Sequence, residues 1–194
     1  RGAMLAVDEY GIDVILTGSK EKIMKCVHDN HIILKNTEIV DANGEILMCD
    51  DARSVLKEKA DSSMGVGFKL LAEGKGDALV SAGSTGAITV GATFLAKRIK
   101  GVKRPCIASV MPSAKNPILL MDCGANAECR PEFLYQFGLM GSLYMKNILK
   151  VENPKVALAN NGEEETKGTP AVKEAYALMK NADYNFVGNI EGRQ

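Results

Sequence analysis

The segment ALANNGEEETKGTP, residues 157–170, holds the side chain best suited to chemistry with an anion. Lys167 follows three glutamates and precedes Gly168 and a Thr-Pro pair, which is typical of a helix start. A lysine in a glycine-flanked loop can meet an anion as a point charge. We therefore expect Lys167 to contact the anion, while Asn161, Glu163 and Gly168 shape the loop around it. A solvated run of surface charges is the alternative that the segment leaves open.

A second segment, VSAGSTGA at residues 80–87, combines glycines with hydroxyl side chains. Glycine allows the backbone to turn, and hydroxyls with free N–H groups at a helix start suit phosphate or carboxylate. The segment lacks the dinucleotide-binding G-x-G-x-x-G pattern and the lysine of a P-loop. A well-capped buried helix is the competing interpretation. If the segment binds phosphate, the expected contributors are Ser81, Gly83, Ser84, Thr85 and Gly86.

The third segment is LLMDCGANAECRPE, residues 119–132, in which Asp122 ends an apolar run. A carboxylate that leaves a buried strand is costly unless it is paired or used. Asp122 and Asn126 are therefore candidate catalytic residues beside Lys167, more suited to arranging the pocket than to taking protons. The alternative is that both hydrogen-bond the loop backbone. Cys123 has no histidine nearby in the sequence to act as its base, which argues against a cysteine nucleophile.

The segment VGNIEGR, residues 187–193, places polar side chains at the end of a further apolar run. Asn189 and Glu191 are candidates for substrate binding there, and Arg193 leaves the same strand.

A basic run, KRIKGVKR, stands out in a chain whose formal net charge is zero. Cations near the C-terminus of a solvated helix are one explanation. Docking of an acidic partner is the other. The residues concerned are Lys97, Arg98, Lys100, Lys103 and Arg104.

Alternating strands and helices must position these residues, and this order predicts an α/β fold with a mostly parallel sheet and helices on both faces. The predicted strands are residues 12–18, 36–42, 77–83, 105–111, 117–124, 155–160 and 185–190. The predicted helices are residues 19–30, 61–73, 84–100, 131–149 and 169–180, with Ser19, Ser84 and Thr169 as caps and Pro131 in a first turn. In the fourth helix we expect one apolar face, with Gly138 and Gly141 allowing close packing; the face consists of Phe133, Phe137, Met140, Tyr144 and Ile148.

The composition excludes several classes of function. The 194 residues include 46% hydrophobic and 25% charged side chains, as in an ordinary globular protein. Scarce aromatics and the absence of Trp argue against base stacking on single-stranded nucleic acid. No apolar run approaches the roughly 20 residues of a membrane span. The five cysteines form no C-x-x-C pair, and His28 and His31 are not near a cysteine pair of zinc-finger type, so we expect free thiols in a reducing cytoplasm and no metal.

Seven segments in order carry a resemblance to a known family. They are DSSM, VSAGSTGA, RIKGVKRP, LLMDCGAN, PEFLYQFGLMG, NNGEEETKG and NFVGNIEGR. Together they resemble the phosphate acyltransferases of bacterial phospholipid synthesis, the PlsX family, over almost the whole chain. Differences from the family pattern are mild: Ser84 replaces asparagine, Ala60 replaces lysine, and Thr169 replaces asparagine.

The resemblance implies transfer of a fatty acyl group from acyl carrier protein to inorganic phosphate, giving an acyl phosphate for the glycerol-phosphate acyltransferase. It also implies a homodimer, a fold like isocitrate and isopropylmalate dehydrogenases and phosphotransacetylase, a cytoplasmic location with possible peripheral membrane contact, and no cofactor. In this chemistry Lys167 and N–H groups of the 80–87 segment would hold phosphate and the developing oxyanion, and the basic run would dock the acidic carrier.

We expect residues 1–194 to form one α/β domain that lacks the family's N-terminal and C-terminal segments. Three alternatives remain at this point. A related enzyme could transfer short acyl groups from coenzyme A, and a nicotinamide-dependent hydroxyacid dehydrogenase shares the fold but would need paired aspartates for its metal. A non-catalytic module that binds phosphate or a carrier protein belongs to a different class.

Overall fold

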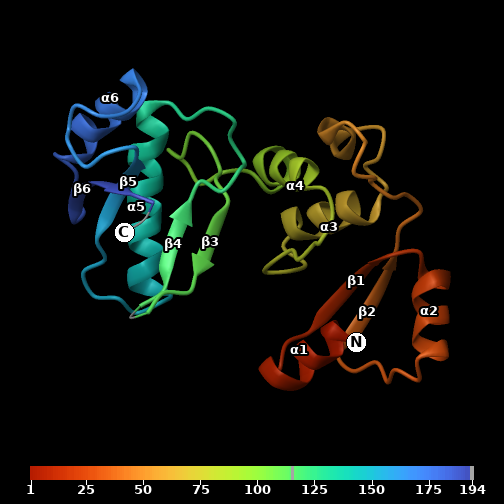
Figure 1. The fold of residues 1–194 in the computed structure, drawn as a ribbon. Coiled ribbons are helices and arrows are strands. Elements are labelled where there is room, and N and C mark those ends of the chain that lie inside the picture. Colours follow the sequence, from red (N-terminus) through yellow and green to blue (C-terminus); the bar gives the residue numbers. More distant parts are fainter. Residues whose placement is uncertain (115, 193–194) are drawn as a thin grey trace. The chain divides into compact units, whose positions relative to one another are not determined.

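The computed structural model describes residues 1–114 and 116–192. It divides into two compact units, Arg1–Ile99 and Lys100–Gln194, each with helices and strands of its own (Figure 1). The α/β class predicted from the sequence is confirmed in both. The prediction of one domain over residues 1–194 stays a prediction, and the two units are described separately below.

The first unit begins with α1 (Gly2–Tyr10), which the sequence did not predict, and a β-α-β arrangement. β1 (Val14–Gly18) and β2 (Thr37–Asp41) are parallel, and α2 (Lys20–Asp29) connects them. The hydroxyl of Ser19 accepts a hydrogen bond from the Lys22 N–H and caps α2, as predicted. A parallel pair needs such a crossover, so the helix follows from the pairing.

The core of the first unit lies among four helical segments: η1 (Ala52–Leu56), α3 (Ser63–Ala72), α4 (Thr85–Gly91) and the π-helical turn η2 (Ala92–Ala96). Its buried side chains are Val55, Met64, Phe68 and Ala87. α3 and α4 pack so closely that a Cβ on Gly91 would lie 2.2 Å from the Phe68 ring. No side chain larger than hydrogen fits at this position.

The second unit contains two strand pairs. β3 (Ala108–Met111) and β4 (Ile118–Met121) are antiparallel, and β5 (Val156–Asn160) and β6 (Phe186–Glu191) are parallel. The long helix α5 (Pro131–Asn147) contacts β4, β5 and α6 (Pro170–Met179), as Figure 1 shows. Leu158, Ala175 and Met179 form the buried cluster of this unit.

Glycines on α5 permit the close packing that the sequence predicts. A Cβ on Gly138 would lie 2.7 Å from the Tyr184 hydroxyl oxygen, and one on Gly141 would lie 3.1 Å from the Met121 sulfur. The predicted apolar face is buried only at Phe133 and Phe137, whereas Ile148 at the far end is 60% exposed.

The structure differs from the sequence predictions in three places. Residues 77–83 form no strand, and Val80 is 94% exposed, because a strand exists only where a partner completes its hydrogen bonds. The helix predicted for residues 84–100 ends at Ala96, where Lys97 takes a left-handed φ of 67°. The described residues form three two-stranded sheets, two parallel and one antiparallel, in place of one mostly parallel sheet.

Candidate functional site

The carboxyl ends of β5 and β6 lie side by side and carry the polar side chains predicted there. Their parallel register sets Leu158 opposite Asn189 and Asn160 opposite Glu191. The loop of residues 161–168 leaves β5 at this edge and leads into α6, whose cap is Thr169, as predicted. In α/β folds ligands bind at this edge of a parallel sheet.

The backbone of Lys167 is fixed on both sides, while its side chain is exposed. The Lys167 N–H donates to the Glu164 carbonyl at 3.0 Å, and the Lys167 carbonyl accepts from the Asn160 side-chain amide at 3.2 Å. In residues 1–114 and 116–192 the Lys167 ammonium forms no ion pair. The loop therefore presents an uncommitted cation on a fixed base.

Glu165, two residues before Lys167, binds side chains at α6 and not the lysine. The Glu165 carboxylate accepts from the Lys180 ammonium at 2.9 Å and from the Tyr176 hydroxyl at 3.1 Å. The hydrogen bond from Lys180, followed by that from Tyr176, holds the pKa of Glu165 below its ordinary value. Glu165 thus ties the loop to α6. Asn161 and Glu163 are exposed on the loop.

Glycine is required at Gly168, directly before α6. Its φ of 89° lies in the left-handed region, and a Cβ there would lie 2.8 Å from the Asn160 side-chain oxygen. The amide that holds Lys167 would have to move to admit any other residue. Gly162 is buried, and a Cβ on it would lie 2.8 Å from Lys167 Cγ, so it makes room for the stem of the lysine.

Asn189 links the loop to the neighbouring strand. Its side-chain amide donates to the Glu164 carbonyl at 2.9 Å, and the residue is only 7% exposed. Its Oδ1 has no hydrogen-bond donor among the residues that the structure describes. Glu191 lies half-buried at the end of β6, and Arg193 lies outside the described residues. Asn189 and Glu191 are therefore at the same strand edge as Lys167.

Asp122 and Asn126 form a second polar cluster in the same unit. The Asp122 carboxylate accepts from the backbone N–H groups of Ile107 (2.7 Å), Ala125 (3.2 Å) and Asn126 (2.7 Å), and from the Asn126 side chain at 3.0 Å. Asn126 donates further to the Pro105 carbonyl at 3.0 Å. The two side chains join the β4–α5 loop to the segment that leads into β3.

Hydrogen bonds decide the ionisation of Asp122. Burial acts to raise its pKa, but the hydrogen bonds from Ile107, Asn126 and Ala125 outweigh it and hold the pKa below the ordinary value. The carboxylate is therefore ionised at neutral pH with its acceptor positions engaged. This geometry suits arranging the loop better than abstracting a proton.

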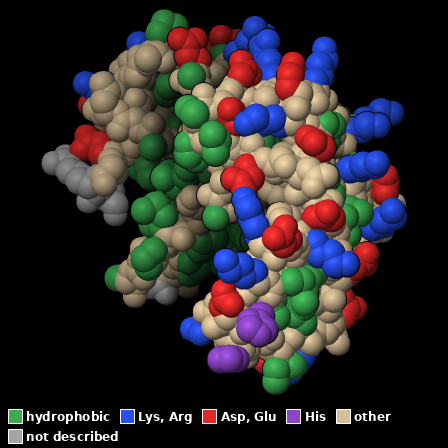
Figure 2. Space-filling model, turned by 90° about the vertical axis from the view of Figure 1, so that its right-hand side faces the viewer, with side chains coloured by type: hydrophobic (Ala, Val, Ile, Leu, Met, Phe, Trp, Pro, Cys, Tyr) green, Lys and Arg blue, Asp and Glu red, His purple; other side chains and the backbone are tan. Residues whose placement is uncertain are grey.

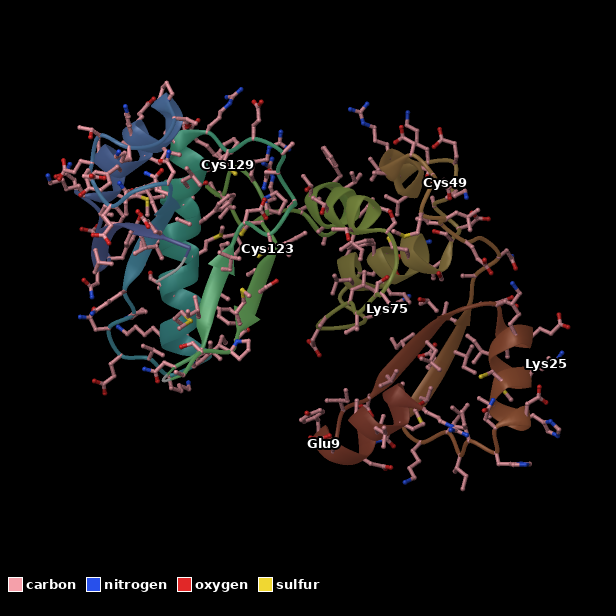
Figure 3. All side chains as sticks on the ribbon, viewed as in Figure 1. Glu9, Lys25, Cys49, Lys75, Cys123 and Cys129 are labelled. Atoms are coloured by element: carbon pink, nitrogen blue, oxygen red, sulfur yellow. The ribbon has the colours of Figure 1, made fainter. Side chains whose placement is uncertain are left out.

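Three cysteines lie near this cluster, two of which are labelled in Figure 3: Cys123 and Cys129, on the loop between β4 and α5. Burial, with smaller contributions from Asp122 and the neighbouring thiols, raises the pKa of Cys106 to about 11. Burial and Asp122 also raise the pKa of Cys129. A thiol that stays protonated is a poor nucleophile, which makes Cys106 and Cys129 poor candidates for that role.

The 80–87 segment belongs to the first unit. The Ser84 hydroxyl accepts from the Ala87 N–H at 3.4 Å and caps α4, as predicted, and the Ser81 hydroxyl accepts from the Gly83 N–H at 3.3 Å. Ser84 is 8% exposed, while Thr85 and Gly86 are exposed. Ser84 is thus committed to the helix, and a phosphate role for this segment would depend on its exposed members.

An apolar pocket of about 250 Å³ lies beside the same segment, within the first unit. Ser81 is its one polar lining residue, and the walls come from α3, α4 and η2 together with Leu79. Ser81 of the 80–87 segment therefore borders a small apolar cavity.

The basic run occupies non-helical backbone after η2, and its five cationic residues are exposed. Lys97 and Arg98 belong to the first unit, and Lys100, Lys103 and Arg104 to the second. Elsewhere charges of both signs alternate over the face in Figure 2, in line with the zero net charge.

The structure thus brings the predicted residues together in two clusters of the second unit and one segment of the first. Sequence reasoning missed Asn160, whose amide fixes Lys167, and the partners of Glu165 on α6. An asparagine directly before Asn-Gly at a strand end, which is typical of side-chain-to-backbone turns, was the available signal for Asn160.

The arrangement is an α/β fold similar to the folds of two solved phosphotransacetylases. The EutD phosphotransacetylase from Staphylococcus aureus has a TM-score of 0.70 at 20% identity, covering 97% of this chain and 64% of that one. A phosphotransacetylase from Streptococcus pyogenes has a TM-score of 0.71 at 19% identity, covering 98% of this chain and 64% of that one. These likenesses establish the fold.

The sequence comparisons establish the family. The family model described as "Fatty acid synthesis protein" matches residues 1–194, and the chain belongs to this family. It is 44% identical over 194 residues to the phosphate acyltransferase of Clostridioides difficile (strain 630), covering 100% of this chain and 57% of that protein. It is 45% identical over 195 residues to the phosphate acyltransferase of Dictyoglomus turgidum, covering 100% and 58%.

The resemblance to phosphate acyltransferases is therefore confirmed. The chain spans 57% and 58% of the length of these two curated relatives. Within residues 1–114 and 116–192, no helix combines the length and apolar character that a membrane crossing requires.

Proposed function

We propose that the complete protein is a phosphate acyltransferase, which moves a fatty acyl group from acyl carrier protein to inorganic phosphate. Identity of 44% to phosphate acyltransferases over the full chain supports the activity. The observation that carries the proposal within the molecule is Lys167: it has a fixed backbone and an ammonium with no ion pair among the described residues, at the carboxyl edge of a parallel strand pair.

The reaction needs positioning and charge stabilisation more than a covalent enzyme intermediate. A phosphate oxygen attacks the thioester carbonyl, the carbon–sulfur bond breaks, and the products are an acyl phosphate and the carrier thiolate, which takes up a proton. We assign Lys167 to neutralise charge on phosphate and on the developing oxyanion. N–H groups of residues 80–87 are assigned to anion binding in the first unit, and Asn161, Glu163, Gly168, Asn189 and Glu191 to shaping the phosphate site in the second.

Asp122 and Asn126 act as positioning residues in this mechanism. Their hydrogen bonds fix the loop before α5 and the lead into β3, and the ionised carboxylate has no free acceptor position for a substrate proton. This assignment requires no metal and no cofactor.

The proposal also covers the partners and the cellular setting. The basic run, residues 97–104, would dock the acidic carrier protein, and a glycerol-phosphate acyltransferase would consume the acyl phosphate. A homodimer in the cytoplasm, with peripheral contact to the membrane, completes the proposal. We also propose that the fold is similar to those of isocitrate and isopropylmalate dehydrogenases.

A comparison of donors tests the activity. The complete protein is mixed with inorganic phosphate and either palmitoyl-carrier protein, palmitoyl-coenzyme A or acetyl-coenzyme A, and acyl phosphate is trapped as its hydroxamate. We expect product chiefly from the carrier thioester. Product chiefly from acetyl-coenzyme A would replace the proposal with a short-chain phosphotransacylase. Binding of carrier protein without product from any donor would indicate a non-catalytic module.

Charge reversal tests the docking surface. Lys97→Glu, Arg98→Glu and Lys100→Glu together should raise the KM for the carrier thioester at least about tenfold and remove its salt dependence. The matched control reverses Lys20, Lys25 and Lys69, which are likewise exposed, lie in the first unit and change the net charge equally. Equal effects of the two triple variants would rule out local docking.

A further inference from the structure

A pocket of about 680 Å³ lies at the N-terminal end of α5, within the second unit. Three cationic side chains line it, Lys103, Arg104 and Arg130, together with the carboxylates of Glu128 and Glu132 and the ring of Phe133. Lys103 and Arg104 also belong to the basic run proposed to dock the carrier protein, and the other lining residues have no role in the proposed function. Its volume is that of a small-molecule site, and its lining is both apolar and charged.

Of the three cations in this pocket, only Lys103 forms an ion pair among the described residues. The Lys103 ammonium lies 3.6 Å from the Glu132 carboxylate. Glu132 also accepts a hydrogen bond from its own backbone N–H, which is the largest cause of its lowered pKa. Neither Arg104 nor Arg130 forms an ion pair with any residue that the structure describes. Two guanidinium groups without an ion pair therefore remain for a ligand, facing the carboxylates of Glu128 and Glu132, of which Glu132 also attracts Arg130 electrostatically.

The backbone of Arg104 is held from both sides. Before it, the Gln136 side chain of α5 accepts from the Lys103 N–H and donates to the Gly101 carbonyl, both at 2.9 Å. After it, the Asn126 amide donates to the Pro105 carbonyl. Arg130 directly precedes α5, and its carbonyl accepts from the Phe133 N–H at 2.9 Å. Both arginines thus extend from a fixed backbone, which lowers the entropy lost when they bind.

The start of the helix contributes little by itself. Pro131 has no N–H, and the Glu132 N–H is already engaged by its own carboxylate. Recognition must come from the two guanidinium forks, and these match the paired oxygens of a phosphate group.

We propose that Arg104 and Arg130 hold a phosphate group in this pocket, and that it is the phosphate of the thioester donor's pantetheine arm. The assignment rests on the proposed function, in which phosphate has two sources, the inorganic acceptor and the phosphopantetheine that carrier protein and coenzyme A share. The inorganic ion would fill a small part of about 680 Å³. An arm with amides and methylenes would also cover Phe133 and Pro131, which favours the donor.

Binding of the free arm tests the proposal without turnover. Calorimetry on the complete protein compares 4′-phosphopantetheine with pantetheine, which differ by one phosphate. The parent should bind the phosphorylated probe more tightly, and Arg104→Gln with Arg130→Gln should weaken it by about tenfold or more while the affinity for pantetheine stays within about twofold. Arg104→Lys with Arg130→Lys, which keeps the charge without the planar guanidinium, should give an intermediate loss. Lys146→Gln, a cation at the other end of α5, should change neither.

Each outcome is decisive. Equal affinity of the parent for the two probes, or unchanged affinity in the glutamine variants, would overturn the proposal. Loss of inorganic phosphate binding without loss of the phosphorylated probe would overturn the donor assignment and place the acceptor in the pocket. A protein that binds the arm through the arginines but forms no acyl phosphate would refute the proposed function and keep the pocket.

Discussion

The Lys167 loop and the Asp122 loop have the same position in the fold but use their polar groups in opposite ways. Each follows the carboxyl end of a strand and leads towards a helix in the second unit. The Asp122 carboxylate accepts four hydrogen bonds from its surroundings. In the Lys167 loop the hydrogen bonds hold the backbone, and the ammonium is left exposed.

The difference separates a side chain that supports the structure from one that is available for chemistry. Removing a side chain that satisfies buried N–H groups costs stability, because those donors lose their partner. Removing an exposed side chain that contacts only substrate costs rate. Substitutions in the two loops should therefore affect different measurements.

The largest effect on rate should come from Lys167→Ala. We expect kcat/KM for acyl phosphate formation to fall by about a hundredfold, since one charge-stabilising contact is lost, with the melting temperature unchanged. Lys173→Ala, an exposed cation on the adjoining α6, is the control and should keep its activity. Equal activity of the two variants would return Lys167 to the solvated surface.

The largest effect on stability should come from Asp122→Ala. The N–H groups of Ile107, Ala125 and Asn126 lose their acceptor, and we expect the free energy of unfolding to fall by about 3 kcal/mol. Urea unfolding followed by circular dichroism measures it. If Asp122→Ala abolished turnover but left the urea midpoint in place, the division between the loops would be wrong.

A pair of glycine substitutions sharpens the comparison at the level of the backbone. Gly168 and Gly124 both have positive φ, but a new Cβ meets the Asn160 side chain only at Gly168 and meets nothing within 4 Å at Gly124. Gly168→Ala should therefore destabilise by about 1–2 kcal/mol more than Gly124→Ala, and it alone should lower activity by displacing the amide that holds Lys167. Unfolding and assay of both variants provide the test.

The smallest expected effect is a dependence of stability on acid. The pKa of Asp122 is lower in the folded protein than its ordinary value of about 3.9, so its contribution is present above that pH and is lost as pH falls through the folded pKa. Denaturation of the parent and of Asp122→Asn across this range should show a shallower slope for the variant. Parallel slopes would mean that other carboxylates account for the acid sensitivity.

Local chemistry explains what the sequence predicted correctly. Ser19, Ser84 and Thr169 cap helices because a hydroxyl can satisfy an N–H three residues away, and Pro131 fits a first turn by its own geometry. Such interactions are complete within four residues, so no tertiary information is needed.

The features that the sequence did not predict depend on contacts between residues far apart in the chain. Val80 has the residues of a strand around it, but no strand in residues 1–114 and 116–192 pairs with it. The partner of Asp122 at Ile107 is 15 residues away, and Asn189 reaches Glu164 across 25. Beside the pocket with Arg104 and Arg130, Gln136 of α5 likewise binds the backbone of Gly101 and Lys103, which are 35 and 33 residues away. Residue types in the sequence were enough to identify candidate site residues. Only the contacts in the structure show which of these side chains support the fold, as Asp122 does, and which are available for chemistry, as Lys167 is.

The shared acceptor at Asp122 also has a kinetic consequence. Three amide protons, those of Ile107, Ala125 and Asn126, end on one carboxylate although they belong to two segments of the chain. When the carboxylate moves away, all three N–H groups lose their acceptor together and become accessible to solvent in the same event. Their exchange with deuterium should therefore occur through one common opening, which makes the lead into β3 and the start of the α5 loop a single cooperative element.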